Sequence, residues 1–124
     1  METLRTETEN GVRSIVLCRA EKYNTITLKL REELSAAIDA ADADPAVRVI
    51  LLRAEGPAFC AGYGLDWSTS LQAKHMSEQS EQGGGGRVWD SVNDYRLMSM
   101  FVDTYMKLWY CRKPTLAAGQ GWCI

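Results

Sequence analysis

Residues 49–52 constrain the fold most, because this run of four apolar residues lies between Arg48 and Arg53 with no polar residue on either face. A strand of this kind is typical of a sheet that is covered on both sides, as in α/β folds with parallel strands. Gly56 and Pro57 follow it, and residues 58–61 resume as a short apolar piece. The run therefore predicts a buried parallel strand.

The segment before this strand has the period of a helix. Thr27 is the expected N-cap, and Pro45 ends the helix after Asp44. The apolar residues of the segment fall on one helical face: Leu30, Leu34, Ala37, Ile38 and Ala41. We expect this face to pack on the sheet.

The N-terminal residues predict a hairpin. Residues 2–8 alternate weakly, and residues 12–17 are mainly apolar. Asn10 and Gly11 between them are the strongest short signal for a hairpin turn, since both residues tolerate a positive φ.

The C-terminal half begins with a polar segment. Residues 68–90 include four consecutive glycines and predict a Gly-rich insert or mobile surface loop. A helix follows that Asn93 or Asp94 caps and that ends at Lys113-Pro114; its aromatic and methionine stripe indicates core packing or a subunit contact. Residues 115–124 predict a strand running into a glycine turn. Alternating strands and helices indicate an α/β sheet with right-handed crossovers.

Composition excludes several classes of function. The net charge of -2 argues against a nucleic-acid partner, whose binding depends on neutralised phosphates. No apolar run reaches the ~20 residues that span a bilayer, and the polar N-terminus is unlike a signal peptide. Four dispersed cysteines and one histidine favour buried, reduced thiols in a cytoplasmic protein over disulfides or a metal site.

The stretch GPAFCAGYGLDW, residues 56–67, places small residues at the end of a strand. Glycines are also found at the end of a second strand, at Gly119 and Gly121. Two backbone N–H groups that converge at such ends can form an oxyanion hole, although two tight turns explain the same pattern. A Cys60–His75 nucleophilic pair is a weak alternative, and Asp66 is more typical of a helix cap than of a catalytic carboxylate.

Three separated motifs, in the same order, resemble the crotonase (enoyl-CoA hydratase/isomerase) superfamily. AFCAGYGLDW is similar to its oxyanion segment, and CRKPTLAAGQGWCI is similar to its Lys-Pro-apolar-Ala-Ala-x-x-Gly strand. The residues from RAEKYN to FCAG resemble its helix, strand and loop. The resemblance implies a crotonase-like ββα spiral, of which residues 1–124 form the N-terminal part of a single domain.

The resemblance also implies roles for individual residues. The backbone N–H of Tyr63 would be one oxyanion donor, and the side chains of Tyr63 and Trp67 would shape the acyl pocket. The substrate-binding segment would include the backbone of Ala61, Gly62, Gly64 and Leu65, with Ala61 and Leu65 near the adenine and pantetheine of coenzyme A. Lys22 and Tyr23 would belong to a loop that approaches the nucleotide. Coenzyme A would be part of the substrate, with no separate cofactor and no metal.

Two departures from the family pattern matter. Gly64 stands where the family usually has Asp. In the family, a Gly-Gly-Gly stretch with the second donor follows the position of Ile124, and the catalytic glutamates lie further on. We therefore expect a spiral truncated after the strand that leads to the second oxyanion turn, and we expect isolated residues 1–124 to be inactive.

The resemblance implies hydration of a 2-enoyl-CoA in the intact domain, with a C-terminal complementing chain as a possible partner. It also implies a homo-oligomer, a trimer or hexamer. The alternative is a non-catalytic truncated paralogue that binds other crotonase-like subunits through its apolar ending and aromatic stripe.

Overall fold

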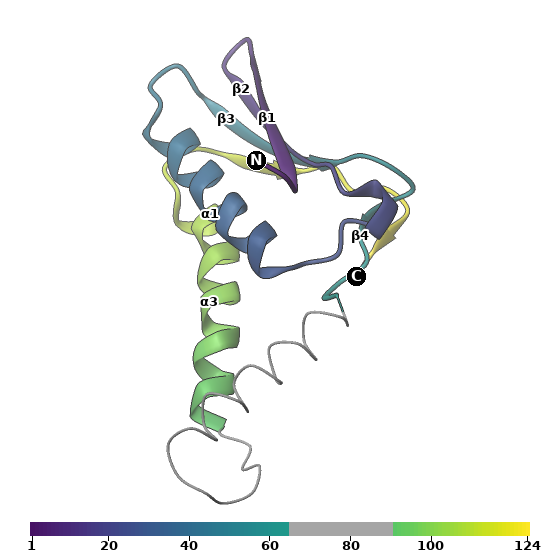
Figure 1. Cartoon of the computed structure of the whole chain (residues 1–124). Helices are drawn as coiled ribbons and strands as arrows, with labels where there is room; N and C mark the ends of the chain where they lie inside the picture. The colour runs from purple at the N-terminus through teal and green to yellow at the C-terminus, as the bar shows by residue number, and fades with distance from the viewer. Residues whose placement is uncertain (65–90) are drawn as a thin grey trace, which may run out of the picture.

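The computed structural model describes residues 1–64 and 91–124, which form an α/β arrangement of one larger and one smaller sheet (Figure 1). The larger sheet has four strands in the order β1-β2-β3-β5. These strands are β1 (Leu4–Glu9), β2 (Val12–Leu17), β3 (Val49–Ala54) and β5 (Thr115–Ala117). The insert predicted at residues 68–90 lies outside the described residues.

The hairpin predicted at Asn10 and Gly11 is confirmed. β1 and β2 are antiparallel, and Leu4 pairs with Leu17 at the far end of the ladder. Both turn residues have positive φ, 51° at Asn10 and 81° at Gly11. The remaining pairs, β2 with β3 and β3 with β5, are parallel, as expected for strands joined through helices.

Helix α1 (Leu28–Ala43) connects β2 to β3. The Thr27 hydroxyl accepts a hydrogen bond from the Leu30 N–H at 3.1 Å, which confirms the predicted N-cap. All five apolar residues expected on its inner face are buried. They pack against the sheet in a core that also contains Leu4, Ile15 and Ile50.

Among the described residues, the two faces of β3 are not equally covered. Ile50 is fully buried in the core that contains the apolar face of α1, whereas Leu51 belongs to the other face and is only partly buried. That face carries charged side chains: Arg53 pairs with Glu7 at 2.7 Å, and Arg5 pairs with Glu7 at 2.9 Å. The apolar run of residues 49–52 thus correctly indicated a strand in a parallel sheet. It did not indicate which elements cover each face of that strand.

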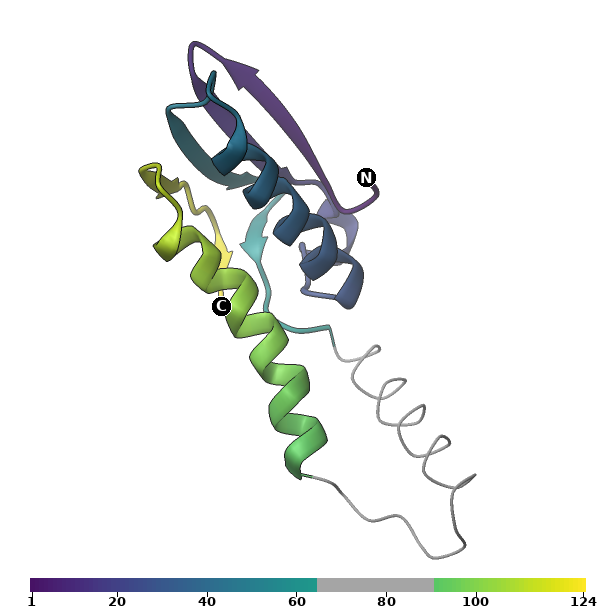
Figure 2. The same cartoon turned by 90° about the vertical axis from the view of Figure 1, so that its left-hand side faces the viewer.

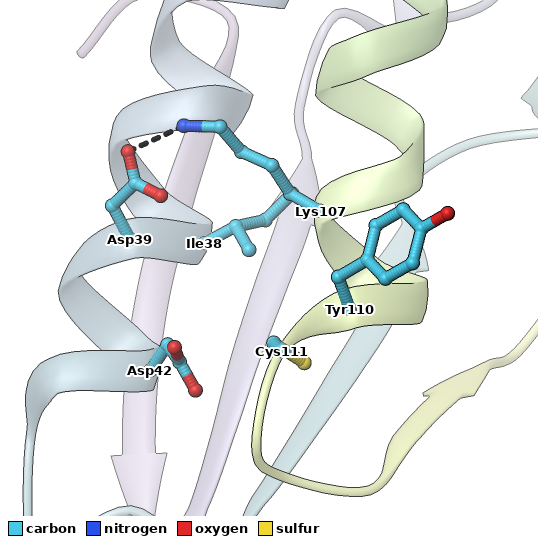
Figure 3. Close-up of a pocket in the computed structure, with 6 residues that line it drawn as sticks. All are labelled: Ile38, Asp39, Asp42, Lys107, Tyr110 and Cys111. Carbon is cyan, nitrogen blue, oxygen red and sulfur yellow. Dashed lines mark hydrogen bonds and ion pairs between the residues drawn. The ribbon is translucent and has the colours of Figure 1, made fainter.

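Helix α3 (Ser91–Tyr110) lies beside α1 on the same side of the sheet (Figure 2). Phe101 and Thr104 are its buried residues. Lys107 Nζ contacts Asp39 Oδ2 at 2.5 Å across the two helices (Figure 3). Lys113 Nζ donates to the carbonyls of Ala41, at 2.6 Å, and Asp44, and so satisfies groups at the end of α1 that lack helical partners.

The smaller sheet pairs β4 (Ala58–Cys60) with β6 (Trp122–Cys123) in parallel. The strand predicted at the start of residues 115–124 is present as β5, whereas β6 is a second strand that the sequence analysis did not predict. All four cysteines are free thiols; Cys60 is buried, but Cys123 is exposed, contrary to the expectation of burial throughout. None of the described helices has the length and apolar character needed to cross a membrane.

Candidate functional site

The predicted site segment, residues 61–64, follows β4 directly and lies beside the loop after β2. The Ala61 N–H donates to the Tyr23 carbonyl at 3.0 Å, and the Ile26 N–H donates to the Gly62 carbonyl at 2.9 Å. The Gly64 N–H donates back to the Ile26 carbonyl at 3.2 Å. The structure therefore places residues 61–64 beside the loop that contains Lys22 and Tyr23. The sequence analysis connected these two segments only by resemblance.

The hydrogen bonds around Tyr63 form a parallel bridge to Ile26. In such a bridge the residues on either side, here Gly62 and Gly64, make the bonds to the partner. The central residue directs its own N–H and C=O to the opposite edge. The Tyr63 N–H thus points away from the Ile26 segment.

The two glycine-marked strand ends meet in the small sheet. Gly62 has φ +91°, and a Cβ built on it would lie 3.7 Å from Ile124 Cγ2. The Ile124 N–H donates to the Cys60 carbonyl at 3.0 Å. At Gly121, with φ +58°, a Cβ would lie 1.9 Å from the Pro57 carbonyl oxygen, so only glycine allows this approach.

The side chain of Tyr63 points toward α3. Its ring meets Phe101 edge-on, with 5.3 Å between the ring centroids. Its hydroxyl lies 3.1 Å from the hydroxyl of Tyr105. Burial, together with this hydrogen bond, raises the pKa of Tyr105 far above its usual range, so the hydroxyl stays protonated. Position 63 is therefore held from both sides, by its backbone neighbours and by α3.

Lys22 and Tyr23 are both exposed beside this segment. Lys22 ends the 3-10 helix η1 (Ala20–Lys22), and Tyr23 follows in the left-handed conformation with φ 51°. The side chain of Lys22 is therefore accessible to solvent. The other residues predicted for substrate binding, Leu65 and Trp67, lie outside the described residues, as do the two alternatives Asp66 and His75.

Asn24 is a site residue that the sequence analysis missed. Its side chain is buried; Nδ2 donates to the carbonyls of Glu55 at 2.9 Å and Ala58 at 3.0 Å, and Oδ1 accepts from the Arg19 N–H at 2.8 Å. Its φ of 51° is a conformation that asparagine tolerates better than most residues. The signal in the sequence was an asparagine inside a loop next to a predicted binding lysine.

Gln120 has the matching role on the C-terminal side. Its Nε2 donates to the carbonyls of Ala54 at 2.8 Å and Gly56 at 3.0 Å. This ties the turn between β5 and β6 to the turn between β3 and β4. Only the fold reveals this role, because a glutamine between two glycines has no distinctive sequence pattern.

A hollow of about 170 Å³ lies between α1 and α3 (Figure 3). It contains none of the predicted site residues; its lining is Ile38, Asp39, Asp42, Lys107, Tyr110 and Cys111. The ion pair of Lys107 with Asp39 crosses it. Within residues 1–64 and 91–124 there is no group of three or more metal-binding side chains.

Comparison with known proteins identifies the family. The family model described as enoyl-CoA hydratase/isomerase matches residues 7–124. The chain belongs to the enoyl-CoA hydratase/isomerase family. The crotonase-like fold expected from the sequence is confirmed by solved structures of the family, including an enoyl-CoA hydratase from Mycobacterium smegmatis. That structure is 34% identical, has a TM-score of 0.78, and matches 94% of this chain and 39% of its own.

Curated relatives of this family carry different activities in their names. The peroxisomal Delta(3,5)-Delta(2,4)-dienoyl-CoA isomerase of Arabidopsis thaliana is 28% identical and matches 100% of this chain and 42% of its own. The hydroxycinnamoyl-CoA hydratase-lyase of Pseudomonas fluorescens is 27% identical, with 99% and 40% matched. The chain thus spans about two-fifths of the length of these enzymes, and their named substrates are all coenzyme A thioesters.

Proposed function

We propose that this chain forms the thioester-activating part of an enoyl-CoA hydratase-type site. Addition of water across a 2-enoyl-CoA places negative charge on the thioester oxygen as the enolate forms. In the proposed site the Tyr63 N–H donates a hydrogen bond to that oxygen. A donor directed at developing charge contributes roughly 3–4 kcal/mol of transition-state stabilisation.

The observation that carries this proposal is the bridge between Tyr63 and Ile26. Because Gly62 and Gly64 make the bonds to Ile26, the Tyr63 amide is directed to the other edge of the strand end. The side chain of Tyr63 packs on α3, so its backbone has a defined position. A fixed donor is favourable because it requires no reorganisation when charge develops.

The neighbouring loop supports a coenzyme A thioester as substrate. Lys22 and Tyr23 are exposed next to Ala61, whose N–H bonds to the Tyr23 carbonyl. In the proposed complex the Lys22 ammonium approaches the phosphates of coenzyme A, and the backbone of residues 61–65 lies along its adenine and pantetheine. Trp67 and Tyr63 border the acyl group.

The proposal requires further groups from outside residues 1–124. A second N–H donor and a glutamate acid or base would come from the rest of a family domain, whether in a longer chain or in a complementing chain. Purified residues 1–124 are therefore expected to show no turnover of crotonyl-CoA. Assembly as a trimer or hexamer is part of the same proposal.

A fusion protein tests the role of Tyr63. Residues 1–124 are joined to the part of the M. smegmatis enoyl-CoA hydratase that follows its matching region, and hydration of crotonyl-CoA is measured. Tyr63→Pro deletes the N–H and is expected to reduce kcat/KM by at least ~100-fold. Tyr63→Phe keeps the N–H and serves as the matched control. Equal activity of the two folded variants, checked by circular dichroism, contradicts the proposed donor.

A second candidate is a non-catalytic chain that binds other subunits of the family. The observation in its favour is that the described end of the chain exposes large apolar side chains, including Leu116, Trp122 and Ile124. Size-exclusion chromatography of residues 1–124 with the full-length M. smegmatis relative distinguishes the two candidates. Co-elution without any gain in hydratase activity favours the binding role, and separate elution contradicts it.

A further inference from the structure

Position 63 lies between two glycines, Gly62 with φ +91° and Gly64. Glycine populates more backbone conformations than other residues, so these neighbours do little by themselves to fix the direction of the Tyr63 N–H. Hydrogen bonds from the Ile26 N–H to the Gly62 carbonyl, and from the Gly64 N–H to the Ile26 carbonyl, anchor the segment. Both bonds run to one residue, so residue 63 can still turn about the line that joins them. The direction of its N–H therefore depends on what holds its side chain.

Helix α3 holds the side chain of Tyr63 at two points. The ring meets Phe101 edge-on, at an interplanar angle of 90°, and Phe101 is fully buried. The hydroxyl, which is the part of the side chain farthest from the backbone, lies 3.1 Å from the Tyr105 hydroxyl. Phe101 and Tyr105 are four positions apart in the helix and therefore lie on one face of it. A contact on the ring and a hydrogen bond at its tip together oppose rotation of residue 63.

Tyr105 is itself held in place by the core. Its side chain packs against the hydrophobic cluster that contains the inner face of α1. Helix α1 begins two residues after Ile26, so the chain of contacts returns to the residue that anchors Gly62. Burial and the bond to Tyr63 raise the pKa of Tyr105, so its hydroxyl keeps its proton at neutral pH. The Tyr63 hydroxyl is thus bonded to a partner with a fixed position and a constant protonation state.

We propose that Tyr105 is a positioning residue of the thioester site. Its hydroxyl holds the Tyr63 hydroxyl, and through the Tyr63 side chain it keeps the Tyr63 N–H directed at the thioester oxygen. The inference rests on the proposed function, and it assigns part of the strength of that donor to a residue 42 positions further along the chain. In this role the Tyr105 hydroxyl contacts Tyr63 rather than the substrate. Its loss therefore weakens transition-state stabilisation and leaves binding of the thioester nearly unchanged.

Nuclear magnetic resonance of the chain labelled with ¹⁵N-tyrosine tests the positioning directly. The heteronuclear NOE of the Tyr63 amide is expected to fall in Tyr105→Phe, which keeps the ring and removes the hydroxyl. Tyr110→Phe, the same change at an exposed residue of α3, is the matched control and leaves that value unchanged. The amide of Tyr23, which donates to the Ala20 carbonyl at 3.0 Å, is the internal reference in each spectrum. A Tyr63 amide that is as ordered, or as disordered, in Tyr105→Phe as in the wild type overturns the inference.

The fusion of the chain with the M. smegmatis enzyme gives the catalytic readout. Tyr105→Phe is expected to lower kcat for hydration of crotonyl-CoA by ~3–10-fold, the effect of one hydrogen bond, while KM changes by less than ~2-fold. Tyr63→Phe breaks the same bond from the other side and is expected to lower kcat equally, whereas Tyr110→Phe leaves it unchanged. The double variant with both Tyr63→Phe and Tyr105→Phe loses no more than either single variant, because all three lack the same bond. Losses that add in the double variant, or a change in KM alone, overturn the inference.

Two outcomes separate a failure of this inference from a failure of the proposed function. If Tyr63→Pro lowers kcat/KM by at least ~100-fold but Tyr105→Phe changes nothing, the N–H donor stands and the positioning role is wrong. If Tyr63→Pro and Tyr63→Phe are equally active, the proposed donor is wrong and the positioning role falls with it. Thermal melts show whether each variant stays folded. Should Tyr105→Phe unfold, the order of the residue 63 amide in Tyr63→Phe, labelled with ¹⁵N-phenylalanine, decides in its place.

Discussion

At the scale of single residues, the loop beside the candidate site depends on buried polar groups that are fully bonded. Asn24 is the clearest example. Its Nδ2 donates hydrogen bonds to the carbonyls of Glu55 and Ala58, and its Oδ1 accepts one from the Arg19 N–H. These three backbone groups belong to three different segments. A single side chain therefore joins the loop at Arg19 to the segment between β3 and β4, close to Tyr63.

Removing that side chain tests its contribution. Asn24→Ala leaves two carbonyls and one N–H without their partner in a buried place, and is expected to lower the free energy of unfolding by about 1–3 kcal/mol. The measurement is urea denaturation followed by circular dichroism. Asn93→Ala, on α3 and away from this loop, is the control and is expected to change stability little. A loss no larger than the control contradicts the structural role.

Glu33 is the second residue whose burial has a measurable consequence. Burial alone raises its pKa, but hydrogen bonds from the Thr3 hydroxyl and from the N–H groups of Glu2 and Thr3 outweigh this and lower the pKa to about 2. Since the folded pKa lies below the unfolded value of 4.5, the stabilisation is complete above pH 4.5. It is lost as the pH falls toward 2.

The expected result is a decline in the free energy of unfolding between pH 4.5 and pH 2. In Glu33→Gln this part of the decline is absent, because the amide does not titrate. At neutral pH the same variant is less stable by about 1–3 kcal/mol, as hydrogen bonds to a charged group are lost. Denaturation of both proteins at a series of pH values provides the data. If the free energy of unfolding falls equally with pH in the wild type and in Glu33→Gln, the titration of Glu33 does not cause the decline.

At the scale of elements, the small sheet depends on a close approach between two turns. β6 pairs with β4 only because Gly121 has no side chain near the Pro57 carbonyl. Gln120, the preceding residue, donates a hydrogen bond from its side chain to the Ala54 carbonyl and so connects the same turn to the end of β3. The geometry of the strand end after Cys60 is thus determined in part by residues far along the sequence.

Gly121→Ala is expected to break the pairing of β4 with β6, since its Cβ would lie 1.9 Å from a backbone oxygen. Hydrogen exchange of the Phe59 N–H, which donates to the Gln120 carbonyl at 2.8 Å, reports this loss. Gly119→Ala is the matched control because its Cβ would meet only Cys123 Sγ at 3.5 Å, an ordinary contact. Unchanged protection in Gly121→Ala would show that the turn can move.

At the scale of the whole molecule, patterns along the chain predicted the elements better than the contacts between them. The hairpin at Asn10 and Gly11, the Thr27 cap and the inner face of α1 depend on neighbours within a few residues, and all were predictable. The unequal cover of the two faces of β3 among the described residues, and the role of Gln120, depend on what lies opposite in space, which periodicity does not encode. The family and its fold were predictable because three motifs agree in order, whereas the role of the Tyr63 N–H remains a prediction.

The parallel registers have a consequence for the order in which structure forms. Thr115 pairs with Ile50, and Trp122 pairs with Ala58, so each pair joins residues more than sixty positions apart. Closing such long loops costs entropy before any contact repays it, whereas the β1–β2 hairpin closes locally. During refolding, the N-terminal hairpin and α1 therefore gain structure first, and the surroundings of Tyr63 are completed last.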